Sequence, residues 1–133
     1  MANIFQELHW LRAEQLSHSA TTDTIVAMPK LVVNLVCKDG MSIEEFRDHW
    51  YEEHAPRAGE IPHMNRYTTA VALDPDDSEY DGIAELYFDD PADIGEAMES
   101  EAMQWALDDL ENFTETDQNS DMVMEETVQV DET

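Results

Sequence analysis

The order of apolar segments along the chain restricts its fold more than any other feature of the sequence. Runs of β-branched and aromatic residues predict strands, and apolar residues three and four positions apart predict helices. From residue 30 onward the order is β-α-β-β-α-β, the split βαβ arrangement of ferredoxin-like folds, so we expect an α+β sandwich. The expected strands are 30–37, 66–74, 82–90 and 122–130, and the expected helices begin after Ser42 and after Asp90.

Local signals mark where the two helices begin. Ser42 is suited to cap the first helix, and Glu45, three residues later, completes a capping box. Asp90 and Pro91 start the second helix, since proline fits the first helical position. Pro56 disfavours helical geometry at the residue before it, so the first helix should end or kink there. The second helix should bury a single stripe, formed by Ile94, Met98, Ala102 and Trp105.

The second and third strands carry apolar or aromatic side chains on both faces. In residues 82–90, Ile83 and Tyr87 point to one side while Leu86 and Phe88 point to the other. Two helices cover only one face of a four-stranded sheet, so a second layer must cover the other face. Another copy of the same chain is the simplest source of that layer, and we therefore expect a homodimer.

The chain carries a formal net charge of -26, from 6 basic and 32 acidic residues in a total of 133. In dilute buffer the carboxylates repel one another, whereas molar salt shortens the Debye length to about 3 Å and screens the repulsion. The composition therefore indicates adaptation to a salt-loaded cytoplasm, as in halophilic archaea, with an acidic DNA mimic as the alternative. Paired acids such as Asp108-Asp109 fit the same solvated surface. The charge also argues against binding to nucleic acid or an anionic membrane.

Several absences restrict the chain further. Cys37 is the only cysteine, which excludes an intrachain disulfide and argues against a zinc–thiolate site. No apolar run approaches the length of a membrane span, and no signal peptide is visible, so the cytoplasm is the expected location. Residues 1–28 carry little of the acidic charge, and we expect a helical or disordered N-terminal extension followed by a folded domain over 29–133.

The segment HWYEEHAP, residues 49–56, holds the densest group of chemically versatile side chains. Trp50 and His54 are four positions apart and share one face of an α-helix, where Trp50 belongs to the core or contacts a ligand. His49 and His54 are five apart, about 140° around the helix, so they should lie on different faces. We therefore expect no metal site. His54 either exchanges protons with a ligand near neutral pH or caps the last helical turn.

Glu85 is the second candidate for acid–base chemistry. It lies mid-strand on the face assigned to a ligand cavity, where apolar surroundings would raise the pKa of its carboxyl group. The alternatives are an ion pair with Arg66 or another cation, or a position at the dimer seam. Tyr67 and Tyr87 should present their hydroxyls to the same space. Asn34 interrupts an apolar strand, so its amide should either orient a ligand carbonyl or bond a neighbouring side chain.

Three segments carry a resemblance to known proteins: GMSIEEFRDHWYEEHAP at 40–56, Arg66-Tyr67, and YDGIAELYFDD at 80–90. Together they resemble the EthD family of dimeric α/β-barrel proteins. The resemblance implies a homodimer whose two sheets face each other around a cavity that binds a small, largely apolar carbonyl or phenolic molecule. It also implies cofactor-free acid–base catalysis of the cyclase, isomerase, dehydratase or decarboxylase type. The alternatives are a non-catalytic accessory or ligand-sensing protein and, third, an oxygen- or haem-linked oxidoreductase.

Overall fold

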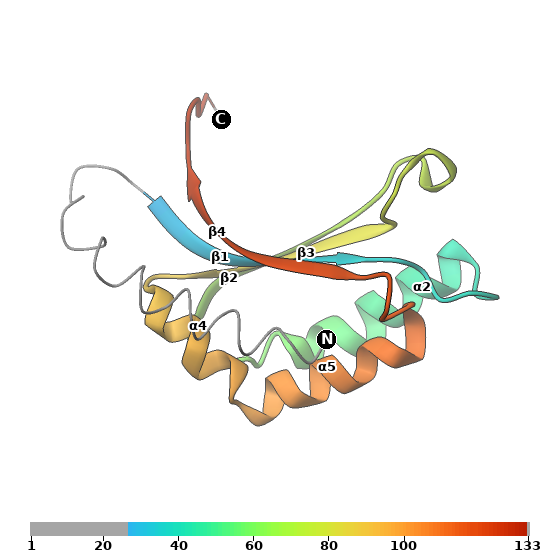
Figure 1. The fold of residues 1–133 in the computed structure, drawn as a ribbon, viewed down its shortest axis with the longest axis horizontal. Helices are drawn as coiled ribbons and strands as arrows, with labels where there is room; N and C mark the ends of the chain where they lie inside the picture. Colours follow the sequence, from blue (N-terminus) through green and yellow to red (C-terminus); the bar gives the residue numbers. More distant parts are fainter. Residues whose placement is uncertain (1–26, 133) are drawn as a thin grey trace.

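The computed structural model describes residues 27–132, which form one antiparallel sheet with helices on one face (Figure 1). The spatial order of the strands is β2-β3-β1-β4, and all neighbouring strands run antiparallel. This is the ferredoxin-like arrangement, so the α+β fold expected from the sequence is confirmed. The strands are β1 (Ala27–Leu35), β2 (Met64–Val71), β3 (Gly82–Phe88) and β4 (Ser120–Thr127).

Strand boundaries differ from the prediction by a few residues. β1 begins at Ala27, inside the expected extension, because Ala27 and Met28 pair with Thr127 and Glu126 of β4. The rest of the expected extension lies outside the described residues. β2 and β4 each begin two residues earlier than predicted and end three residues earlier.

The first helical segment continues through Pro56 instead of ending before it. The expected capping box is present, since the Glu45 N–H donates to the Ser42 hydroxyl at 3.0 Å and the Ser42 N–H donates to the Glu45 carboxylate at 2.9 Å. Pro56 lies in the first turn of a helix, where its missing N–H is tolerated. The helix is irregular at a different place, before Pro56. The segment consists of α2 (Ile43–His49), a π-helical turn η2 (Trp50–His54) and α3 (Ala55–Ala58).

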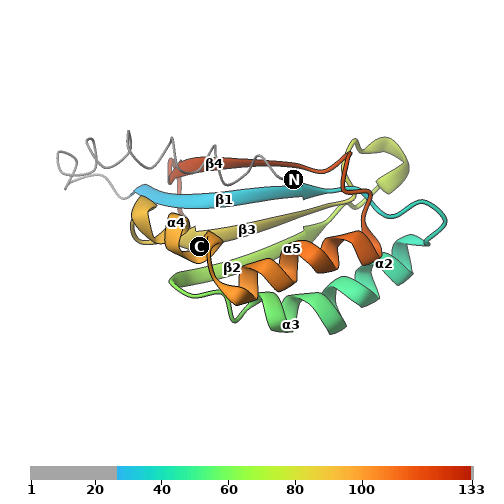
Figure 2. The same cartoon turned by 60° about the horizontal axis from the view of Figure 1, so that its bottom comes forward.

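The second helical segment is two helices, α4 (Pro91–Met98) and α5 (Glu101–Phe113), rather than one. The break occurs because the Ser100 hydroxyl accepts the Met103 N–H at 3.1 Å and caps a new helix. After the break, α5 runs alongside the first helical segment beneath the sheet (Figure 2). A 3₁₀ turn, η3 (Pro75–Asp77), lies between β2 and β3. None of the helices within residues 27–132 combines the length and apolar character needed to span a bilayer.

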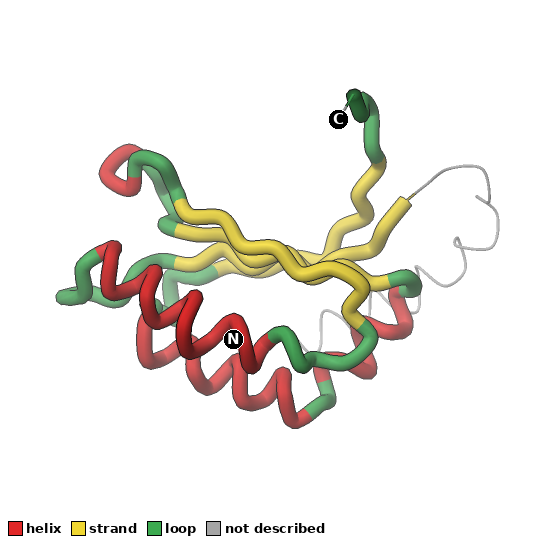
Figure 3. Tube along the Cα trace, turned by 180° about the vertical axis from the view of Figure 1, so that it is seen from behind, coloured by secondary structure: helices red, strands yellow, loops and turns green. Residues whose placement is uncertain are grey.

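The two faces of the sheet differ in their cover (Figure 3). On the helix side, Phe46, Trp50 and Phe88 are fully buried in the core. The other face has no cover within the described part of the chain. It exposes apolar side chains from two strands, namely Ile83 of β3 and Met122 and Met124 of β4.

Candidate functional site

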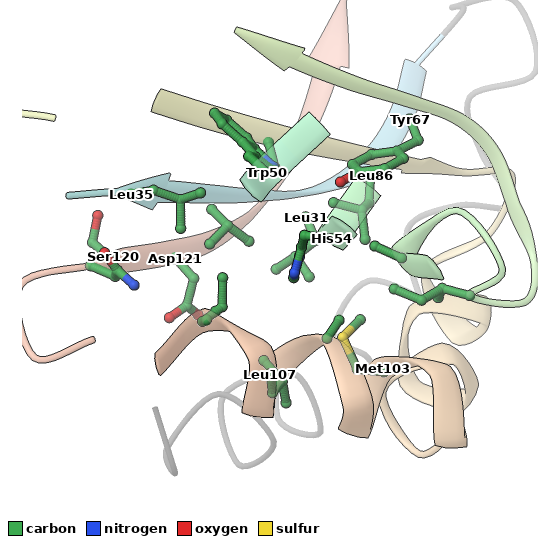
Figure 4. Close-up of a pocket in the computed structure, with 17 residues that line it drawn as sticks. Leu31, Leu35, Trp50, His54, Tyr67, Leu86, Met103, Leu107, Ser120 and Asp121 are labelled. Atoms are coloured by element: carbon green, nitrogen blue, oxygen red, sulfur yellow. The ribbon is translucent and has the colours of Figure 1, made fainter. Parts of the chain in front are cut away.

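A cavity of about 50 Å³ lies between the sheet and the helices, inside a single chain (Figure 4). Its walls are mostly apolar side chains of β1, β3 and α5. Side chains with polar groups also line it, and Trp50, His54 and Tyr67 are among them. Ser120 and Asp121 lie at the end opposite Tyr67 (Figure 4). The resemblance implied a cavity between two facing sheets, whereas this one lies on the helix side of the sheet.

The π-helical turn places His49 and His54 on the same side of the helical segment. Within the turn, the Ala55 N–H donates to the Trp50 carbonyl, five residues back instead of four. Both imidazoles therefore reach the carboxylate of Asp109 on α5. The expectation that the two histidines occupy different faces was wrong, because it assumed 3.6 residues per turn throughout. Among residues 27–132, no group of three or more His, Cys, Asp or Glu side chains is arranged to hold a metal ion.

His54 has one ring nitrogen engaged by the protein and lies in the midst of the cavity-lining residues (Figure 4). Its Nδ1 is 2.7 Å from Asp109 Oδ2, and no group within the described residues hydrogen-bonds its Nε2. Burial lowers the pKa of His54, although the hydrogen bond and charge of Asp109 act in the opposite direction. The imidazole is therefore neutral near pH 7, with a proton on Nδ1 facing the carboxylate and a lone pair on Nε2.

Trp50 supplies a buried hydrogen-bond donor that the described residues leave unused. Its Nε1–H has no partner among them, and such a donor costs about 1–3 kcal/mol when it is buried unsatisfied. Burial raises the pKa of Tyr67, so its hydroxyl is protonated at neutral pH. The indole lies near enough to act on that pKa in the opposite direction, without forming a hydrogen bond of normal geometry. The cavity thus combines two donors, Trp50 and Tyr67, with one base, His54.

A glycine makes room for Trp50 against the sheet. A β-carbon added to Gly82 would lie 2.4 Å from Cζ3 of Trp50, far inside contact distance. The backbone at Gly82 is held on both sides, because Gly82 pairs with Leu35 of β1 and with Val71 of β2. Phe46 also contacts the indole, with ring centroids 5.5 Å apart. These contacts fix the position of the indole and hence of its Nε1–H.

Glu85 and Tyr87 lie on the open face of the sheet, on the opposite side from His54. Alternation along β3 places Leu86 against the cavity and its two neighbours on the other side. Tyr67 pairs with Leu86 and shares its side, so the two tyrosines do not face one space as expected. The sheet therefore separates the predicted site residues into two groups.

A charged network occupies the middle of the open face. Lys30 Nζ bonds the carboxylate of Glu85 and, at 2.8 Å, that of Glu126. Burial alone would lower the pKa of Lys30, but these two carboxylates raise it well above its usual value. The Tyr87 hydroxyl donates to Glu126 at 2.9 Å, and the Asn34 amide donates to a serine hydroxyl of β4 at 3.0 Å. Glu85 thus has a cationic partner, as the ion-pair alternative predicted, and that cation is Lys30 rather than Arg66.

Asp109 belongs to the site, and the expectation that it lies on the solvated surface was wrong. Its side chain is buried, and it also accepts the Asn112 amide N–H at 2.9 Å. Burial would raise the pKa of Asp109, yet the hydrogen bonds from Asn112 and the two histidines lower it, so the group is a carboxylate at neutral pH. Its spacing is the signal that could have found it, because it lies four residues from both Trp105 and Phe113 on the buried side of α5.

The chain is similar to known proteins in both sequence and structure. Residues 38–117 match the EthD domain. The structure aligns with an EthD family protein from Bacillus halodurans with a TM-score of 0.66 and 22% identity, over 75% of this chain and 99% of that one. A dimeric ferredoxin-like protein of unknown function from Bacteroides fragilis aligns with a TM-score of 0.55 and 15% identity, over 76% and 96% of the two chains.

A third similar structure is SnoaB, a cofactor-independent oxygenase from Streptomyces nogalater, with a TM-score of 0.51 and 12% identity over 80% of this chain and 96% of that one. At such identities the solved structures establish the fold alone. Among curated proteins, none matches the sequence significantly.

Proposed function

Since the chain belongs to the EthD family, we propose that it binds a small, largely apolar carbonyl or phenolic molecule in the cavity and transfers a proton on it without a cofactor. One observation carries the proposal. The base His54 and the unused donor of Trp50 line the same, mostly apolar cavity. Few convergent polar groups in an apolar pocket are typical of small-molecule sites.

In the proposed reaction, Nε2 of His54 accepts a proton from a carbon or hydroxyl group of the ligand. Asp109 stabilises the imidazolium that forms through the hydrogen bond at Nδ1. The electron pair left behind moves onto the ligand oxygen, where the Trp50 N–H and the Tyr67 O–H donate to the growing negative charge. Return of the proton to a different atom gives an isomerisation, and departure of a leaving group gives a dehydratase type of reaction.

Replacing His54 with glutamine should abolish proton transfer while the fold stays intact. The probe is exchange of carbon-bound hydrogen for deuterium in D₂O, followed by NMR on a panel of small enolisable ketones and phenols. We expect the wild-type protein to accelerate exchange for part of the panel. The variant should lose about 10²–10⁴-fold of that rate, the usual contribution of a general base. Circular dichroism checks the fold.

His63→Asn is the matched control, because His63 is an exposed histidine whose φ of 73° asparagine tolerates. Equal exchange rates for the wild type and His54→Gln would refute the role of His54. If the wild type binds panel members without accelerating exchange, and Trp50→Phe weakens that binding, the ligand-sensing alternative is correct instead.

We further propose that a second copy of the chain covers the open face of the sheet. Exposed Ile83, Met122 and Met124 support it, as does the dimeric state described for the Bacteroides fragilis protein. Ile83→Glu should therefore yield a monomer by light scattering in molar KCl, because the interface would desolvate a carboxylate. Leu73→Glu is the control, since Leu73 is fully exposed in the loop after β2. A monomeric wild type, or an unchanged mass for Ile83→Glu, would contradict the proposal.

A further inference from the structure

We propose that His49 is a third member of the acid–base site and, in addition to burial, favours the neutral form of His54 by sharing the carboxylate of Asp109. The consequence for reaction rate rests on the proposed function. The coupling between the two imidazoles stands on the geometry of the cluster alone. Nothing in the family match or in the similar structures assigns a role to this pair of histidines.

The three side chains form one continuous hydrogen-bonded cluster. Asp109 Oδ2 lies 2.7 Å from His54 Nδ1 and 3.0 Å from His49 Nε2, so both rings meet at one oxygen. His49 Nε2 is also 3.1 Å from Oδ1, which in addition accepts the Asn112 amide N–H at 2.9 Å. The carboxylate is thus fully engaged by three donors. The single negative charge of Asp109 therefore interacts with both imidazoles.

The two imidazoles differ in their access to water. The His49 side chain is 25% exposed, whereas the His54 side chain is 7% exposed. Phe113 lies against both rings, with centroids 4.7 Å from His49 and 5.1 Å from His54. Solvent therefore reaches the cluster at His49. His54 occupies the buried position beside the cavity, where a base must be neutral to accept a proton.

Because both histidines share one carboxylate, the charge on His49 affects the protonation of His54 in a predictable direction. When His49 carries a proton, its positive charge compensates Asp109 and opposes protonation of His54. When that charge is absent, the whole carboxylate charge is available to stabilise an imidazolium at His54.

Other ionisable groups near His54 stay the same when His49 is changed. Tyr67 of β2 and Asp121 of β4 line the same cavity. Arg57 of α3 stacks 4.0 Å from the ring centre of Trp105, whose ring also contacts His54. On the side of His49, the acidic neighbours Asp48 and Glu52 are exposed. A difference between variants at position 49 therefore isolates the contribution of His49.

The test is an NMR titration of the His54 ring in the full chain in molar KCl, with its signals assigned by their loss in His54→Gln. His49→Gln keeps a hydrogen-bond donor and removes the imidazole, so we expect the pKa of His54 to rise by about 1 unit. Asp109→Asn removes the shared negative charge, and the same pKa should fall below the wild-type value. His49→Phe, which keeps a ring against Phe113, should shift it in the same direction as His49→Gln.

An unchanged or lower pKa of His54 in both His49 variants would overturn the proposal, whatever happens to their stability. If the protein catalyses exchange, its rate should fall as the pH is lowered and His54 becomes protonated. In His49→Gln this fall should begin at a higher pH than in the wild type, in agreement with the pKa measured by NMR. A raised pKa in a protein without catalytic exchange would leave the coupling established and refute only the proposed function. The two failures are therefore distinguishable.

Discussion

Replacing Gly82 with alanine should lower the free energy of unfolding by about 2–3 kcal/mol, the upper range for an overpacked core. The added β-carbon would lie 2.4 Å from one atom of the Trp50 ring and 2.8 Å from another. Trp50 is fully buried, so the ring cannot move aside without disturbing the core. The melting temperature should fall by about 4 °C per kcal/mol in a domain of this size. The NMR signal of the indole N–H should shift in any protein that still folds.

Gly59→Ala is the matched control for this substitution. Gly59 ends α3 with φ −64°, which any residue adopts, and its added β-carbon would approach a backbone oxygen at 3.3 Å. We expect its effect on stability to stay within about 1 kcal/mol. Equal effects of the two substitutions would show that the indole is not held against the β3 backbone as described.

Lowering the salt concentration should destabilise the protein steeply. The chain has a net charge of -26, and its carboxylates repel one another over longer distances as the ionic strength falls. The melting temperature measured by calorimetry should rise continuously from millimolar to molar KCl. Each kcal/mol of relieved repulsion corresponds to about 4 °C in the melting temperature. Adaptation to a salt-rich cytoplasm, which the composition favours, predicts this dependence.

A variant with fewer negative charges separates screening from general effects of salt. Asp76, Asp77 and Glu79 are exposed in the connection between β2 and β3, so replacing all three with lysine should not disturb packing. The triple variant should depend less on KCl and be more stable than the wild type at low salt. A melting temperature that does not change with KCl in the wild type would contradict the proposed adaptation.

Local signals in the sequence were sufficient for the order of elements and for the start of the first helix. The capping box at Ser42 and the alternation in β3 both depend on neighbouring residues only, and both are present in the structure. The break at Ser100 also has a local signal, since serine favours an N-cap, but the apolar stripe through Ala102 suggested one continuous helix.

The geometry of the site could not be predicted because it depends on contacts between distant segments. The π-helical turn departs from the 3.6-residue period on which the placement of His49 was based. Asp109 lies 55 residues from His54 in the sequence, and only the packing of α5 brings it there. The separation of Glu85 from His54 requires knowing which face of the sheet the helices cover.

The π-helical turn makes the length of the segment as important as its composition. Such a turn contains one residue more than the α-helical turn it replaces. Loss of either exposed glutamate, Glu52 or Glu53, would leave both histidines in the chain yet rotate one relative to the other by about 100°. A homologue with a one-residue gap here would keep every reactive group and lose the shared carboxylate. Alignment gaps in this helix therefore distinguish relatives with different sites even when their residues match.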